Sequence, residues 1–162
     1  MASAQAAAQA PQAANGVQQQ PAPGLTINAQ YVRDLSFENP GAPGIFLPGQ
    51  AGEPHLEVAV NVQTRKMGDA VHEVVLTMKA TSKFGEQIGF IAELSYAGLF
   101  SVPPVQEQEL RNLLLIECPR QLFPFARAIL SDMVRDGNFP PLLLAPIDFA
   151  AIVRHNEERP KA

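Results

Sequence analysis

Residues 55–99 read HLEVAVNVQTRKMGDAVHEVVLTMKATSKFGEQIGFIAELSYAGL, and this stretch decides the fold. It contains three runs of apolar residues alternating with others, at 55–63, 71–82 and 87–99. Alternation with a period of two is typical of half-buried β-strands, because successive side chains point to opposite faces. Short connections containing Gly68 and Gly85 join the runs. We therefore predict an antiparallel meander of three strands.

A further strand is predicted at residues 25–38, before the meander. Its polar face carries Asp34 and Glu38, and Arg33 interrupts its apolar face. The residues expected to share the apolar face are Leu25, Ile27, Ala29, Tyr31, Leu35 and Phe37. This strand joins the meander through a long connector.

The connector, residues 39–54, is rich in proline and glycine, which excludes a strand. Loops of this length in compact domains are usually functional or disordered. The middle of the connector nevertheless holds three adjacent large apolar residues, Ile45, Phe46 and Leu47. We therefore expect these side chains to pack against another apolar surface.

The period changes to that of a helix after residue 104. A first helical segment begins near Gln106, and Pro119 predicts a kink or break near Cys118. Apolar residues then recur at helical spacing up to Gly137, which predicts the end of the long helix. Asp148 is a candidate N-cap for a last short helix.

Strands followed by helices predict an α+β fold: a four-stranded antiparallel sheet, then a long kinked helix and a short C-terminal helix. Residues 1–24, rich in Ala, Gln and Pro, are expected to form a disordered tail, and residues 156–162 a flexible one. The folded domain then spans 25–155. Its sheet has apolar residues on both faces, such as Ile91 beside Phe90, so we expect oligomerisation to cover the second face.

Composition excludes several classes of function. The net charge is -4 and no cluster of Lys and Arg occurs, which argues against nucleic acid as a partner. No apolar stretch approaches the length of about 18 residues that spans a membrane, so direct membrane insertion is not expected. The single Cys118 fits a reducing compartment, and residues 1–24 lack the pattern of a secretory signal. We expect a soluble, cytoplasmic protein.

Few residues suggest covalent chemistry. The three histidines and Cys118 are scattered, without the spacing of a metal site, and no glycine-rich phosphate loop precedes a helix, so neither a metal nor another cofactor is expected. Cys118 is interpreted as a buried structural thiol, so no catalytic residue is assigned. Asp34, Glu38 and Glu93 could form an acid–base group in a pocket, a solvated surface or a protein-binding patch.

Large apolar residues in proline-rich segments favour a binding function. One such segment is the connector, and the other runs from Phe139 to Phe149. Either could simply cap the sheet. Proline restricts the chain beforehand, however, so these segments can hold apolar side chains at a surface with little further loss of entropy. We interpret the protein as one that offers apolar surface to a partner chain.

Several motifs together resemble the SecB family of protein-export chaperones. They match in order and with compatible spacing over about residues 25 to 155. The matching stretches are YVRDLSFENPGAP (31–43), HEVVL (72–76), GLF (98–100), CP (118–119), LFPFAR (122–127) and GNFPPLLLAPIDF (137–149). The Ala/Gln/Pro tail departs from the family pattern, because it is longer than usual.

The resemblance implies a homotetramer, a dimer of dimers built by pairing four-stranded sheets. It also implies an ATP-independent holdase that binds unfolded secretory precursor proteins in the cytosol and delivers them to the SecA motor for translocation across the inner membrane. The implied motor-binding residues are Asp34, Glu38, Ile91 and Glu93. The implied interface strand carries Ala92, Leu94 and Tyr96. The implied substrate groove is formed by Ile45, Phe46, Leu47, Leu56, Val58, Val60, Phe149 and Ile152.

Two other readings of the sequence remain open. A small oligomeric enzyme would use one of the carboxylates as a base and would need a deep polar pocket around it. A plain scaffold or assembly domain would not bind unfolded chains at all.

Overall fold

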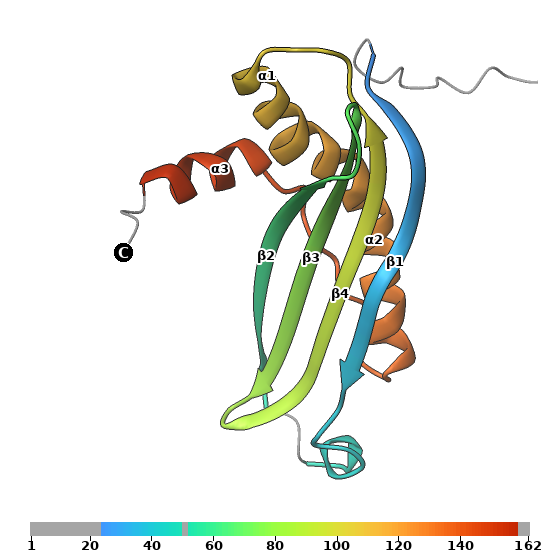
Figure 1. Ribbon diagram of the computed structural model, residues 1–162. Coiled ribbons are helices and arrows are strands. Elements are labelled where there is room, and N and C mark those ends of the chain that lie inside the picture. Colours follow the sequence, from blue (N-terminus) through green and yellow to red (C-terminus); the bar gives the residue numbers. More distant parts are fainter. Residues whose placement is uncertain (1–23, 50–51, 159–162) are drawn as a thin grey trace, which may run out of the picture.

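The computed structural model describes residues 24–49 and 52–158. Figure 1 shows a sheet with the long helix along one of its faces. The strands are β1 (Thr26–Glu38), β2 (Pro54–Lys66), β3 (Val71–Phe84) and β4 (Gln87–Ser101). The helices are α1 (Glu107–Asn112), α2 (Cys118–Asp136) and α3 (Phe149–Glu158). The predicted tail lies outside the described residues except for Gly24, and α3 continues past the predicted domain boundary at residue 155.

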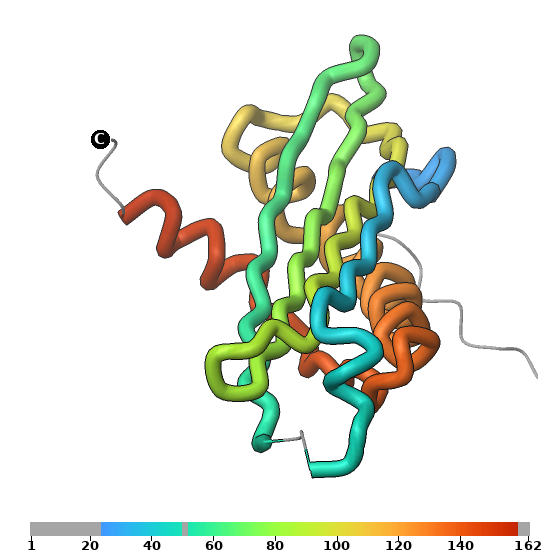
Figure 2. Tube along the Cα trace, turned by 90° about the horizontal axis from the view of Figure 1, so that it is seen from below, coloured from blue at the N-terminus to red at the C-terminus, as the bar shows by residue number. Residues whose placement is uncertain are grey.

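The four strands form one antiparallel sheet in the order β1-β4-β3-β2, which confirms the predicted α+β fold. Short turns join β2 to β3 and β3 to β4, whereas the connector carries the chain from β1 to the far edge of the sheet at β2. Figure 2 shows this connector crossing one end of the sheet. Both ends of the connector therefore lie at sheet edges.

The core lies between the sheet and α2. From residue 72 to 82 of β3 and from 90 to 100 of β4, the even-numbered positions, such as Leu76, Met78 and Leu94, are buried on the face that meets α2. There Leu122, Ala126 and Leu130 pack against the sheet. We call this the helix face and the opposite side the open face. Within the described residues, α2 contacts mainly β3 and β4, so β2 extends beyond the helix.

The predicted kink or break near Cys118 takes the form of an irregular turn within one continuous long helix. The chain makes a π-helical turn at Leu113–Glu117 and runs directly into α2. A wider turn at this place accommodates Pro119, which has no N–H to donate to the preceding turn. Gly137 ends α2 as predicted. Asp148 caps α3, because its Oδ1 accepts a hydrogen bond of 3.0 Å from the N–H of Ala151.

Strand β1 does not keep the single apolar face that its alternation predicts. The pairing with β4 shifts by one residue between Ile27 and Ala29, and again between Val32 and Asp34. Each shift is a β-bulge, in which an extra residue reverses the side to which all later side chains point. Because directly paired residues share a face, Tyr31 and Ala29 lie on the open face, and Leu35 and Phe37 on the helix face. The predicted common face is therefore wrong for Ala29 and Tyr31.

Gly137 leaves room for the ring of Phe37. A Cβ atom at Gly137 would lie 2.6 Å from Cε1 of Phe37, whose ring is itself stacked on Phe90. We expect Gly137→Ala to lower the free energy of unfolding by about 1–3 kcal/mol, because the ring has little space to move. Gly44→Ala is the matched control, since no atom of the described residues lies within 4 Å of a Cβ there. Denaturant titration measures both, and equal midpoints for the two variants would contradict this explanation.

His72 makes the stability of the fold depend on pH. Its ring is buried, its Nδ1 has no partner among the described residues, and desolvation together with nearby Lys66 lowers its pKa. The unfolded chain therefore binds a proton near pH 6.5, while the folded chain resists it. We expect stability to fall as the pH drops below about 6.5, by up to about 1.4 kcal/mol per pH unit.

The pH dependence is measured by denaturant titration at a series of pH values. The variant His72→Phe should flatten the curve in this range, whereas His55→Gln should not, because His55 is exposed. An unchanged curve in His72→Phe would assign the effect to other groups.

Candidate functional site

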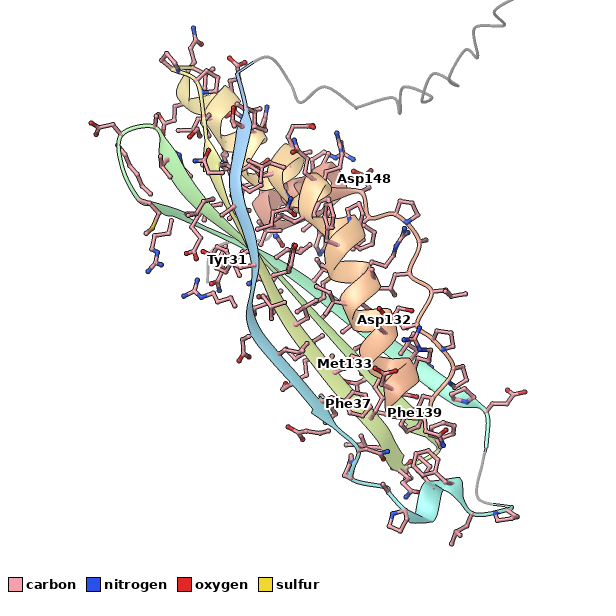
Figure 3. All side chains as sticks on the ribbon, turned by 90° about the vertical axis from the view of Figure 1, so that its right-hand side faces the viewer. Tyr31, Phe37, Asp132, Met133, Phe139 and Asp148 are labelled. Atoms are coloured by element: carbon pink, nitrogen blue, oxygen red, sulfur yellow. The ribbon has the colours of Figure 1, made fainter. Side chains whose placement is uncertain are left out.

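A cluster of phenylalanines lies at one end of the helix face. Phe139, just after α2, is at its centre, with ring centroids 5.0 Å from Phe90 and 5.5 Å from Phe46. Phe37 and Phe84 complete it at 6.4 and 6.5 Å from Phe139. Figure 3 shows Phe37 and Phe139 close together beside the end of α2. We call these residues (Phe37, Phe46, Phe84, Phe90 and Phe139) the phenylalanine cluster.

A cavity of about 540 Å³ opens beside the cluster. It lies between the connector, the start of β2 and the segment after α2, and most of its lining is apolar. The lining residues are Ile45, Phe46, Gly52, Pro54, Leu56, Ser82, Phe84, Phe90, Asn138, Phe139, Pro140, Pro141, Leu142 and Leu143. Concave apolar surface of this size can accept large apolar side chains of another molecule.

The cavity continues into an apolar strip along β2. Leu56, Val58 and Val60 pair with the helix-face residues Ser82, Ala80 and Met78, so they point to the same side. Leu56 and Val58 are about two-fifths exposed, because α2 does not reach this edge. At the far end Val60 and Ile152 line a smaller recess of about 70 Å³ between β2 and α3. The cavity, strip and recess together form a surface that we call the groove.

The segment from Asn138 to Asp148 forms one wall of the groove without regular structure. Its prolines cannot donate backbone hydrogen bonds, and Phe139 and Leu142 anchor it in the core. Arg127 holds it from α2 by donating a 3.2 Å hydrogen bond from Nη1 to the carbonyl of Leu144. Leu143, between these anchors, is 86% exposed. The wall thus presents a large apolar side chain to solvent.

The structure separates the predicted groove residues into three groups. Ile45, Phe46, Leu56, Val60 and Ile152 line the cavity or the recess, and Val58 lies between them on β2. Leu47 is exposed but lines neither hollow. Phe149 is a correction: it is 1% exposed and packs edge-on against Phe123, so it belongs to the core.

Three phenylalanines that line the cavity are missing from the groove predicted from the sequence. Phe139, Phe84 and Phe90 were not assigned to it, although the run from Phe139 was singled out as an apolar cluster. The sequence feature that points to Phe139 is the dipeptide Pro140-Pro141 directly after it. Two adjacent prolines stop the chain from entering a helix or a sheet. An aromatic residue held before such a stop is available to line a cavity.

The open face brings together the predicted acidic residues. Glu38 pairs with Ile91, Ser36 with Glu93 and Asp34 with Ser95, which are alternate pairs of β1 and β4 and therefore share one face. We call Asp34, Glu38, Ile91 and Glu93 the acidic patch. Glu93 lies 3.8 Å from Lys79, a surface pair that is only weakly stabilising. All three carboxylates face solvent, so they lack the enclosing pocket that acid–base catalysis would need.

The predicted interface residues lie elsewhere than expected. Ala92 and Leu94 are completely buried and Tyr96 nearly so, beneath α2 within a single chain. Tyr96 also stacks on Phe125, with ring centroids 6.4 Å apart. These side chains have almost no surface with which to touch a second subunit, so they can influence an interface only through the helix that they support.

The described residues offer no reactive thiol, metal site or membrane-spanning helix. Cys118 is fully buried, and desolvation raises the pKa of its thiol to about 12, so it is a structural residue and a poor nucleophile. Residues 24–49 and 52–158 contain no group of His, Cys, Asp and Glu side chains suited to hold a metal ion. None of the helices described is long and apolar enough to cross a membrane.

Comparison with known proteins identifies relatives over most of the chain. A protein-export protein SecB from Maricaulis maris is 56% identical over 133 residues, covering 82% of this chain and 77% of the relative. Another from a Bradyrhizobium species is 46% identical, covering 88% of this chain and 87% of the relative. A SecB-like chaperone from Mycobacterium tuberculosis, solved in complex with an antitoxin peptide, has the same fold, with a TM-score of 0.61 at 14% identity over 77% of this chain and 91% of that chain.

The family model described as preprotein translocase subunit SecB matches residues 18–160, a range that contains both the groove and the acidic patch. The chain therefore belongs to the SecB family of protein-export chaperones.

Proposed function

We propose that the protein is an ATP-independent holdase that captures unfolded precursor proteins in the cytoplasm and delivers them to the SecA motor. The observation that carries the proposal is the groove, an aromatic cavity that continues into exposed apolar surface on β2. Such surface is rare on monomeric soluble proteins unless a partner covers it. The peptide bound to the Mycobacterium tuberculosis chaperone supports the use of this fold for holding a chain segment.

The groove suits a partner of variable sequence. Apolar contact has no fixed direction, so a phenylalanine-lined cavity accepts many large side chains. Strand β2 is also a sheet edge, and its free backbone groups can pair with an extended segment. A protein that binds only the unfolded form stabilises it by mass action and delays folding. This mechanism requires no nucleotide.

The open face suits a second partner at the same time. The acidic patch lies across the sheet from the groove, so a client in the groove leaves it uncovered. Its charge favours a basic surface, which we assign to the SecA motor. Competition from the motor for the client would then drive release.

A homotetramer fits the edge of the sheet. Strand β1 is the other edge, thirteen residues long, and its Val32 and Leu35 are nearly half exposed. A long edge strand with apolar side chains tends to pair with another chain. We assign β1 to pairing with a second copy, and two such dimers to the tetramer.

Refolding of a secretory precursor tests the function. A stoichiometric amount of the protein should slow refolding severalfold in buffer without ATP. Lysozyme at the same concentration controls for crowding. An unchanged refolding rate would reject the holdase activity and leave the scaffold reading.

A further inference from the structure

Glu73 stands out on the open face because it is buried. Its side chain is only 5% exposed, and it is the one buried acidic side chain in the part of the chain that the structure describes. It lies on β3, paired with Leu99 of β4 and Arg65 of β2, away from the acidic patch. Burying a carboxylate is unfavourable unless partners compensate its charge, so its contacts need an explanation.

The partners of Glu73 come from both edges of the sheet. From β1, Tyr31 donates a 2.6 Å hydrogen bond to Oε1, and Arg33 lies 3.2 Å from Oε2. From β2, Arg65 reaches Oε2 at 3.0 Å. The hydrogen bond from Tyr31, followed by the two guanidinium groups, lowers the pKa of Glu73, so it stays ionised. Figure 3 shows Tyr31 on the side of β1 away from α2.

Arg33 has a special position in β1. Val32 pairs with Tyr96 and Asp34 with the next residue along β4, Ser95, so Arg33 is the extra residue of the second bulge. The extra residue of the first bulge, Asn28, is held in a similar way by a 2.8 Å hydrogen bond to Ser101. In both bulges a polar contact fixes the side chain of the residue that has no partner in the strand pairing.

The second bulge determines which residues of β1 serve each surface. Beyond it, Asp34 and Glu38 lie on the open face, and Phe37 joins the phenylalanine cluster on the helix face. Without it, simple alternation from Val32 would turn both carboxylates toward α2 and Phe37 toward solvent. Both surfaces of the proposed function thus depend on one irregularity in the strand.

We propose that Glu73 is a positioning residue that holds Arg33 at the bulge. It thereby fixes the phase of β1, by which we mean the face of the sheet to which each residue after the bulge points. This phase places the acidic patch on one face and Phe37 in the phenylalanine cluster on the other. The biological meaning of this inference rests on the proposed function. The phase of the strand, however, can be measured in the isolated protein, without client or motor.

A disulfide across β1 and β4 reports the phase. Ser36 and Glu93 are directly paired on the open face, so cysteines at both positions lie within bonding range only when the bulge is in place. The native Cys118 does not interfere, because it is buried. In the S36C/E93C background, we compare the rate of disulfide formation under limiting oxidant for Glu73→Gln, Arg33→Gln and Arg65→Gln.

We expect about tenfold slower cross-linking in Glu73→Gln and Arg33→Gln, because a charge-assisted contact at the bulge is lost. Arg65→Gln is the matched control: it removes a contact to the same carboxylate from β2, which carries no bulge, and should cross-link at the parent rate. Arg33 is 46% exposed, so its variant should fold even if Glu73→Gln does not. Far-ultraviolet circular dichroism verifies folding.

Two outcomes would overturn the proposal. Parent-like rates in a folded Arg33→Gln variant would mean that the bulge needs no such contact. Equal slowing in Arg65→Gln would mean that Glu73 stabilises the sheet in general and not the bulge. If the phase proves as expected but the protein does not delay refolding, the proposed function fails and the positioning role stands.

Discussion

Replacing Phe46 and Leu47 together by serine is expected to raise the Kd for an unfolded client about 10- to 100-fold. Both side chains are substantially exposed in the free protein, at 42% and 59%, so a bound client can bury them further. Leu47 contributes little to the fold, whereas Phe46 also packs on Phe139, so we expect a modest fall in the free energy of unfolding that still leaves the variant folded. Binding of a fluorescently labelled unfolded precursor, measured by anisotropy, gives the Kd.

Met67→Ser is the matched control for this variant. Met67 is 52% exposed, but it lies in the turn between β2 and β3, at the opposite end of β2 from the connector that carries Phe46 and Leu47. It should bind clients as the parent does. The oligomer should remain intact in both variants by size-exclusion chromatography with light scattering. Dissociation of the Phe46/Leu47 variant would show that these residues stabilise the assembly and do not capture clients.

Reversing the charge at Asp34 and Glu38 is expected to spare client binding and to weaken docking to the motor about tenfold at low salt. Both carboxylates lie on the open face, remote from the groove. The difference from the parent should shrink toward 1 M salt, where the Debye length is about 3 Å. Surface plasmon resonance with immobilised SecA across a salt series measures both effects.

The control for charge reversal is the pair Asp132 and Asp136. Both lie on α2, are well exposed, and pair with Arg135 at the surface. Asp132→Lys with Asp136→Lys changes the net charge by the same amount without touching the acidic patch. If both double variants weaken motor docking equally, general charge is responsible and the acidic patch has no specific role.

The period of the apolar residues was sufficient to predict the sheet and its meander. In β2, β3 and β4 each residue's side follows from its position, because the hairpins keep simple alternation over nearly the whole length of the strands. The ends of α2 and α3 followed from local chemistry, since Gly137 stops one helix and Asp148 caps the other. These features depend on residues that are close together in the chain, so they can be predicted from the sequence alone.

The irregularities of β1 could not be predicted in the same way. Arg33 was visible as a polar residue that broke the apolar face, and this was the sign of the bulge. We attribute it to Glu73 on β3, forty residues away, whose carboxylate is also held by Tyr31 of β1 and Arg65 of β2. Such a contact forms only after the sheet assembles, so no local pattern encodes it. The burial of Phe149 beneath Phe123 has the same origin in tertiary packing.

The two faces of the sheet carry different chemistry because alternation separates them. On β4, Phe90 contributes to the phenylalanine cluster, while its neighbour Ile91 belongs to the acidic patch. Under the proposed function, a client and a motor would therefore bind on opposite sides of the same strand without competing for surface. This arrangement would allow handover from a single ternary complex.

The most direct measurement of the central claim is a titration of the purified protein with a chemically unfolded polypeptide, without nucleotide, followed by native mass spectrometry. It reports the oligomer and the complex in the same spectrum. We predict a tetramer of this chain that binds the unfolded polypeptide with a defined stoichiometry and does not bind the same polypeptide once it has folded. A protein that forms no complex with the unfolded chain at micromolar concentrations would contradict the claim that the groove is kept open for clients.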